Sequence, residues 1–217
     1  MAPASTLRIP NSAVFVCDIQ EKFRKAIHEF DKVILTSRKV LRAAAILDVP
    51  VVVTTQNRAR LGDTVPELSS LYSADSAAQS GADKKAKLIV DADKTVFSMW
   101  TPEVQAAFAS APTPFSSVVI IGIESHICVT QTALDLLAAG YKVYILADGV
   151  SSSNAEEVPI AMARLRAAGA TVTTSEGWMY ETMGDAGIPA FRQIVGLVKD
   201  TSADTKLALS TLLSSKI

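Results

Sequence analysis

Cysteine and histidine are scarce in this sequence, which holds two of each among its 217 residues. Cys17 and Cys128 lie far apart, and neither belongs to a CxxC motif or to a Cys/His spacing typical of metal sites. The sequence therefore predicts no disulfide framework and no structural zinc site. We accordingly expect a reducing, cytoplasmic compartment. As a separate hypothesis, the protein is expected to work without a metal or another cofactor.

Long hydrophobic runs are also missing. The N-terminal residues MAPASTLRIPNS lack the apolar stretch of a secretory signal, and no run approaches the roughly 20 residues of a membrane-spanning helix. No membrane partner is expected. The last residues, Ser215-Lys216-Ile217, are near the SKL-type peroxisomal address but end in Ile. A three-residue match is weak, so coincidence is the favoured explanation and peroxisomal targeting the alternative.

Charge of one sign is not in excess either. The 21 Lys and Arg residues nearly balance the 22 Asp and Glu residues, for a formal net charge of −1, and the basic residues are scattered. Such a distribution builds no field that would attract nucleic acid or an anionic membrane. A small, roughly neutral substrate or a protein partner is the better expectation.

Short apolar, β-branched runs recur along the chain and are almost unbroken by polar residues, as is typical of parallel strands buried on both faces. They cover residues 13–17, 50–55, 88–90, 117–121, 142–146 and 170–173. Segments with the 3.6-residue period of amphipathic helices lie between them, at residues 31–47, 102–109, 128–139 and 155–168. This alternation predicts βαβ crossovers in a three-layer, Rossmann-like α/β fold.

The hydrophobic content of 49% is enough for one sizeable core, so one domain is expected. We assign residues 9–199 to that domain and residues 200–217 to a C-terminal tail with a short amphipathic piece. Residues 58–87 are polar, which predicts a long excursion from the sheet. We expect this excursion to carry a short helix and to cover the functional site or an interface.

Three reactive residues follow predicted strands, where ligands of open parallel sheets bind. Asp18 ends AVFVCD, Lys94 lies in ADKTVFSMW, and Cys128 follows VVIIG. A thiolate at a helix N-terminus beside an ammonium group is a good nucleophile, and a nearby carboxylate can carry its proton. Each residue also has a structural explanation: Asp18 as a helix N-cap, Lys94 as a solvated loop residue, and Cys128 as a small buried side chain.

Several ordered motifs carry a resemblance to a known family. FVCDIQEKF, KTVFSMW and GIESHICVTQTALDLLAAGYKVYILADGVSS resemble the isochorismatase-like cysteine hydrolase superfamily, and TTQNRARLGDTVPEL and TSEGWMYETMGDA are most similar to its eukaryotic isochorismatase domain-containing proteins. The resemblance covers roughly residues 9–198. It implies a six-stranded parallel sheet between helices, a catalytic triad of Asp18, Lys94 and Cys128, and assembly into homodimers or homotetramers.

The resemblance also implies a mechanism. A cis peptide bond between Ile123 and Glu124 would turn the Glu124 N–H toward the pocket, where it would form an oxyanion hole with the Cys128 N–H. The Cys128 thiolate would attack the carbonyl of an amide, imide or ester-like substrate. The leaving group would depart with a proton from Asp18, and water would hydrolyse the thioester.

Departures from the superfamily pattern narrow the range of expected substrates. The Asp-x-His motif of zinc-containing nicotinamidases is absent, because TTQNRARLGD stands in its place. Isochorismatases that cleave a vinyl ether commonly lack the cysteine, so Cys128 favours acyl chemistry. Glu124 replaces a small residue and would narrow the pocket or add a competing charge. Gln56 and His126 are the expected substrate contacts.

Two rival functions stay open. The fold can serve as an oligomeric interaction protein with little or no turnover, since Glu124 and the altered second-strand loop depart from the pattern. A ribonuclease is the less favoured alternative, because phosphodiester cleavage usually relies on metal-binding carboxylates, paired histidines or a basic groove.

Overall fold

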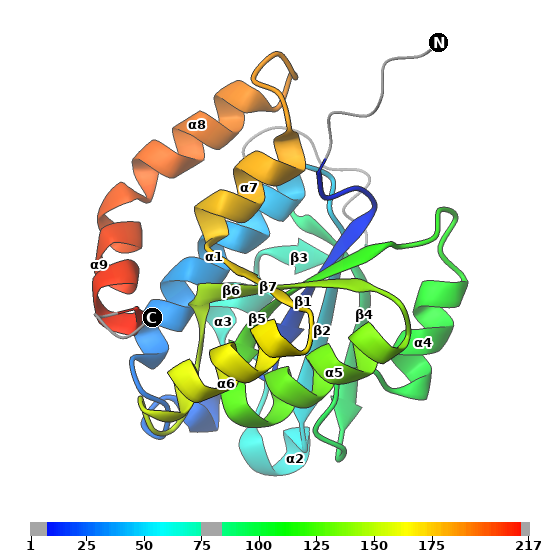
Figure 1. Cartoon of the computed structure of the whole chain (residues 1–217), viewed down its shortest axis with the longest axis vertical. Helices are drawn as coiled ribbons and strands as arrows, with labels where there is room; N and C mark the ends of the chain where they lie inside the picture. The colour runs from blue at the N-terminus through cyan, green and yellow to red at the C-terminus, as the bar shows by residue number, and fades with distance from the viewer. Residues whose placement is uncertain (1–7, 75–83, 214–217) are drawn as a thin grey trace.

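The computed structural model describes residues 8–74 and 84–213, and a parallel sheet forms its centre (Figure 1). The strand order is β3-β4-β2-β1-β5-β6-β7. The strands are β1 Ser12–Cys17, β2 Val51–Gln56, β3 Tyr72–Ser73, β4 Ala86–Lys94, β5 Ser117–Ile123, β6 Lys142–Ser151 and β7 Thr171–Thr173. The predicted α/β class with a parallel sheet between helices is confirmed.

The number of strands differs from the six that were predicted, because Tyr72 and Ser73 pair in parallel with β4 at the edge of the sheet. A strand of two residues is too short to show the hydrophobic run by which the other strands are recognised. The sheet therefore has one edge strand more than predicted, and this strand lies inside the polar excursion.

The helices divide between the two faces of the sheet (Figure 1). They are α1 Phe30–Ile46, α2 Arg58–Leu61, α3 Pro66–Ser69, α4 Pro102–Ala109, α5 Thr130–Ala138, α6 Glu157–Ala167, α7 Ser175–Met183, α8 Phe191–Asp200 and α9 Ser202–Leu212. A π-helical turn, η4 Ser125–Val129, precedes α5. The four predicted helices occur within a few residues of their expected bounds, whereas α7 and α8 were not predicted.

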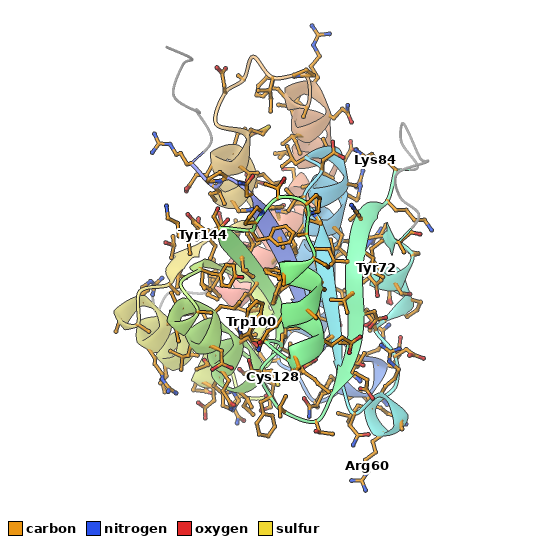
Figure 2. The ribbon with its side chains drawn as sticks, turned by 90° about the vertical axis from the view of Figure 1, so that its right-hand side faces the viewer. Arg60, Tyr72, Lys84, Trp100, Cys128 and Tyr144 are labelled. Carbon is orange, nitrogen blue, oxygen red and sulfur yellow. The ribbon has the colours of Figure 1, made fainter. Side chains whose placement is uncertain are left out.

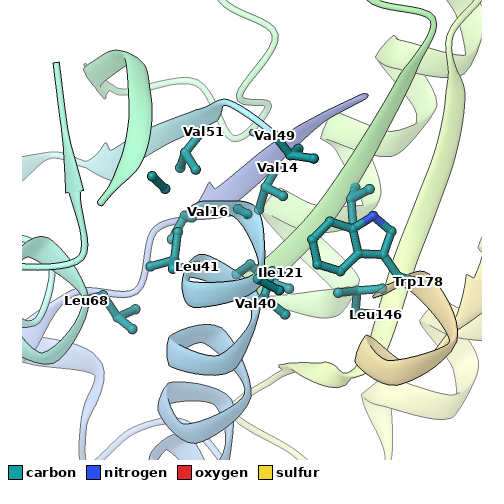
Figure 3. Close-up of a cluster of buried hydrophobic side chains, with 14 of the residues drawn as sticks. Val14, Val16, Val40, Leu41, Val49, Val51, Leu68, Ile121, Leu146 and Trp178 are labelled. Carbon is teal, nitrogen blue, oxygen red and sulfur yellow. The ribbon is translucent and has the colours of Figure 1, made fainter. Parts of the chain in front are cut away.

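Alternation along the buried strands builds two separate apolar layers. Val14 and Val16 of β1 join Leu41 of α1 and Trp178 of α7 in one layer (Figure 3). Phe15 and Cys17 point to the opposite face, into the layer formed with α4, α5 and α6. The face to which Cys17 belongs is therefore also the face that carries η4.

The polar excursion holds α2, α3 and β3, and residues 75–83 of it lie outside the described part of the chain. Its first half returns to the segment that leaves β1, where Gln20 and Thr64 form an isolated antiparallel bridge and the Val65 N–H donates to the Ile19 carbonyl at 3.0 Å. The excursion therefore adjoins the carboxyl end of β1.

The predicted tail contains a helix that packs on the domain. Thr205 and Ala208 of α9 are buried, and the buried Lys39 Nζ of α1 donates to Thr205 Oγ1 at 2.7 Å. Ser215-Lys216-Ile217 lies outside the described residues, so its targeting role stays a prediction. In the ranges that the structure describes, no helix is long and apolar enough to span a membrane.

Candidate active site

The predicted reactive residues lie at the carboxyl ends of β4, β1 and β5, three of the four strands in the run β4-β2-β1-β5. Lys94 is the last residue of β4, Asp18 follows β1 directly, and Cys128 lies in η4, the turn after β5. The sheet register pairs Gln56 with Lys94 and Cys17 with both Thr54 and Gly122. Figure 2 shows Cys128 toward the end of the molecule that carries Arg60 of α2, away from Lys84.

A buried ion pair joins two of the three residues. The Lys94 Nζ lies 2.7 Å from Asp18 Oδ2, and both side chains are at most 2% exposed. Asp18 has a φ of 50°, a left-handed conformation that Asp adopts more readily than most residues and that turns the chain sharply out of β1. The Thr54 hydroxyl donates to the other carboxylate oxygen, Oδ1, at 2.8 Å. Both oxygens of Asp18 are therefore held, Oδ1 by Thr54 of β2 and Oδ2 by Lys94 of β4.

The Lys94 ammonium has three further acceptors, which fix its position. It donates to Gln56 Oε1 at 2.7 Å and to the carbonyls of Phe97 at 3.0 Å and Val96 at 3.3 Å. Burial acts to lower the pKa of Lys94, but electrostatic coupling to Cys17, Asp18 and Cys128 outweighs it and raises that pKa above its usual range. Lys94 therefore stays charged in the closed site.

Cys128 is 7% exposed and packs in the same layer as Cys17. Its carbonyl accepts a hydrogen bond from the Thr132 hydroxyl at 2.6 Å, which ties η4 to the first turn of α5. The Cys17 and Cys128 side chains are close enough to interact, and both thiols are free. Burial, the contact with Cys128 and the charge of Asp18 raise the pKa of the Cys17 thiol well above its usual range.

The peptide bond between Ile123 and Glu124 is cis. The Glu124 carboxylate accepts a hydrogen bond from the Ser153 backbone N–H at 2.7 Å. Its charge is therefore engaged with the turn that follows β6. The oxyanion hole built from the Glu124 and Cys128 N–H groups stays a prediction.

The two expected substrate contacts differ in their surroundings. Gln56 uses both ends of its amide within the site, since Oε1 accepts from Lys94 and Nε2 donates to the Thr95 carbonyl at 2.8 Å. The half-buried His126 lies 2.9 Å from the Ser152 hydroxyl through Nδ1. The geometry thus makes Gln56 a support for Lys94, whereas substrate contact by either residue stays a prediction.

Two residues of the site were not found from the sequence. The buried Gln20 accepts from the Gln56 N–H at 2.7 Å and donates to the carbonyls of Gln56 and Gly62 at 3.2 and 2.6 Å. Thr54 holds Asp18 as described above. The sequence did contain a signal for both residues, because each is a polar residue near the carboxyl end of a buried strand. Gln20 follows Asp18 by two positions.

A cavity of about 1130 Å³ lies at the opposite, amino-terminal edge of the sheet. Its lining includes Ser12, Asp48, Pro50, Lys84 and Phe115 and contains no cysteine or histidine. We place the candidate active site at the carboxyl edge, where nucleophile, carboxylate and ammonium converge.

Within residues 8–74 and 84–213, no group of three or more His, Cys, Asp and Glu side chains is arranged to hold a metal ion.

Comparison with known proteins identifies the family of the chain. The Isochorismatase domain matches residues 12–177. Isochorismatase domain-containing protein 2 of Xenopus laevis is 40% identical over 197 residues, 91% of this chain and 88% of that protein. The secreted isochorismatase effector Isc1 of Phytophthora sojae is 41% identical over 193 residues, 88% and 87% of the two chains. The structure of MAR1 ribonuclease from Caenorhabditis elegans is 36% identical, with a TM-score of 0.76 over 87% of this chain and 90% of that one. The chain therefore belongs to the isochorismatase domain family.

Proposed function

We propose that this protein is a cysteine hydrolase that cleaves an amide, imide or ester-like bond of a small molecule without a cofactor. The observation that carries the proposal is the buried Lys94–Asp18 ion pair, which interacts electrostatically with Cys128 at the carboxyl edge of the sheet. An acid–base group, a fixed positive charge and a thiol in one closed site are the components of nucleophilic acyl transfer.

In the proposed reaction, Asp18 takes the proton of the Cys128 thiol, and the Lys94 ammonium stabilises the thiolate. The sulfur attacks the substrate carbonyl, and the Glu124 and Cys128 backbone N–H groups receive the oxyanion. Asp18 then gives the proton to the leaving amine or alcohol, which leaves a thioester on Cys128. Water, deprotonated by Asp18, hydrolyses the thioester and restores the thiol.

The test is a screen of small primary amides, imides and esters with the wild type and with Asp18→Asn, Lys94→Met and Cys128→Ala. We expect Asp18→Asn to lower kcat by about 10²–10⁴-fold, as is usual for loss of a general acid–base group. Cys128→Ala should abolish turnover, and Cys128 in the wild type should carry the acyl group in rapidly quenched samples. Full activity of Cys128→Ala would contradict the mechanism.

Ribonuclease activity is a second candidate, because the C. elegans structure at 36% identity is of a ribonuclease. Attack by a ribose hydroxyl on phosphorus needs a base and a positive charge but no protein thiol, so Asp18 and Lys94 would suffice. We expect such an activity to survive Cys128→Ala and to be lost in Asp18→Asn. A third possible reaction is cleavage of a vinyl ether, which is tested with isochorismate as the substrate. This reaction would proceed through protonation by Asp18, so it would also survive Cys128→Ala.

These variants also address the interaction-protein alternative. A purified protein that turns over none of these substrates, while Cys128→Ala still binds the same partners as wild type in pull-down experiments, would favour a binding function on this fold. Turnover that depends on Asp18 and Cys128 together would exclude that the site is only a structural remnant.

A further inference from the structure

The two cysteines of the chain meet in the folded protein, although 110 positions separate them in the sequence. Alternation along β1 directs Cys17 into the layer that also contains Cys128. Cys17 pairs in register with Gly122 of β5, the strand that leads into η4. Cys128 is among the groups that raise the pKa of the Cys17 thiol, so the two side chains are close enough to interact. The proposed hydrolysis uses Cys128 and leaves the second thiol beside it without a function.

Cys17 also shares its charged neighbours with Cys128. Its Sγ lies 3.7 Å from Asp18 Oδ2, the same oxygen that accepts from Lys94 Nζ at 2.7 Å. The Lys94 charge interacts with both sulfurs. Cys17 is fully buried, whereas Cys128 retains some exposure, so a small oxidant from solvent reaches Cys128 first.

We propose that Cys17 is the resolving thiol of Cys128, so that a peroxide converts the pair into a reversible intramolecular disulfide that stops hydrolysis. The inference rests on the proposed function only in that it needs a nucleophilic Cys128. It adds a covalent modification site and names the oxidant as hydrogen peroxide or an organic hydroperoxide.

The chemistry balances in two steps. The Cys128 thiolate attacks one peroxide oxygen, an S–O bond forms, the O–O bond breaks, and the released hydroxide or alkoxide takes a proton. Cys17 then gives its proton to Asp18 and attacks the Cys128 sulfur, so that an S–S bond forms and the S–O bond breaks. The departing hydroxide leaves as water with that proton. Two thiols lose two electrons, and the peroxide gains them.

In the reduced protein, the environment of Cys17 favours its role as the resolving thiol. Because the pKa of the Cys17 thiol is raised by burial and by the Asp18 charge, Cys17 stays protonated and does not react with peroxide itself. It reacts only when Cys128 presents an electrophilic sulfur within contact. A disulfide also protects Cys128 from irreversible oxidation to the sulfinic acid.

The experiment treats the full, reduced chain with increasing hydrogen peroxide and maps tryptic peptides without reductant. Wild type should lose two hydrogen atoms in intact mass and yield peptide 9–22 linked to peptide 95–142. Dithiothreitol should separate the peptides and restore the hydrolysis of the untreated sample. Cys17→Ala should instead accumulate the Cys128 sulfinic acid, with two added oxygen atoms and no recovery in dithiothreitol.

Two controls make the outcome decisive. Cys17→Ser repeats the comparison if Cys17→Ala does not fold, and the wild-type peptide map needs no variant. Iodoacetamide labelling of the reduced protein reports the reactivity of Cys128 independently. A Cys128 that is alkylated and supports hydrolysis, but passes to the sulfinic acid as fast in wild type as in Cys17→Ala, overturns this inference alone. A Cys128 inert to iodoacetamide, peroxide and substrates overturns both proposals.

Discussion

At the scale of single residues, the candidate site depends on how the two oxygens of Asp18 are occupied. Oδ2 faces Lys94 and Cys17, and Oδ1 accepts from the Thr54 hydroxyl at 2.8 Å. A carboxylate that exchanges a proton during catalysis must keep its orientation while its charge changes. Thr54 supplies that orientation from the neighbouring strand.

Replacement of Thr54 by Val tests this positioning role. The variant keeps the side-chain shape but removes the donor to Asp18, so we expect kcat to fall by about tenfold with little change in KM, and stability to fall by about 1–3 kcal/mol. Steady-state kinetics and urea unfolding measure the two effects. Thr55→Val is the matched control, because the equally buried Thr55 donates to Asp93 instead. Equal losses of kcat in both variants would contradict the role of Thr54.

The raised pKa of Cys17 predicts a pH-dependent contribution to stability. A thiol whose pKa is raised by folding stabilises the folded state below its unfolded pKa of about 8.5, and this contribution is lost as the pH rises through the folded value. The stability difference between wild type and Cys17→Ala should therefore shrink above about pH 8.5, by up to about 1.4 kcal/mol per pH unit. Urea unfolding with a reductant, between neutral and alkaline pH, measures it; a constant difference would show that Cys17 ionises equally in both states.

At the scale of secondary-structure elements, the approach of β5 to β1 shapes the site. Gly122 has a φ of 120°, and a Cβ added there would lie 2.1 Å from the Cys17 carbonyl oxygen. Only glycine leaves room for the β1 backbone at the point where both strands deliver their site residues. The close contact is made by backbone atoms, so no rotation of a side chain can relieve it.

Gly122→Ala should therefore be severely destabilising. Gly140 is the matched control, since it also has a positive φ, 89°, but has nothing within 4 Å of an added Cβ. We expect Gly140→Ala to cost about 1 kcal/mol for its backbone conformation alone, and Gly122→Ala to cost at least about 2 kcal/mol more because of overpacking. Urea unfolding of the two variants measures the difference. Similar losses would mean that the strands separate at little cost.

At the scale of the whole molecule, α9 raises the question of where the folded domain ends. The sequence assigned residues 200–217 to a tail, and that boundary stays a prediction, although α9 packs against α1 through the buried Lys39 and Thr205. Burial lowers the pKa of Lys39, partly offset by the charges of Asp148, Glu176 and Asp204. The assembly of the chain into a dimer or tetramer also stays a prediction, which light scattering of the purified protein tests.

Two truncations define the extent of the domain. Removal of residues 202–217 uncovers Lys39 and the face of α1, so we expect Tm to fall by several degrees, as a loss of about 1–3 kcal/mol would cause. Removal of residues 214–217 alone leaves α9 intact and should change Tm little. If both truncated proteins melt like wild type, the predicted boundary at residue 199 is adequate.

The sequence by itself determined the layered α/β class, the positions of the long strands and the strand ends at which Asp18, Lys94 and Cys128 lie, because hydrophobic periodicity is a local property of the chain. The family motifs gave the same three residues as a set. The pattern missed other elements: β3 has only two residues, and α7 and α8, which follow the predicted strand at residues 170–173, were not recognised.

Only the tertiary structure decided which side chains touch. The contacts of Thr54 with Asp18, of Gln20 with Gln56, and of Cys17 with Cys128 depend on the order β4-β2-β1-β5 and on the register between neighbouring strands. Neither quantity is encoded in local periodicity, since parallel strands far apart in the chain pair through crossovers whose geometry depends on the packing of the whole core. For the same reason, the sequence placed Cys17 in a predicted strand but could not show that it shares a layer with Cys128 in the fold.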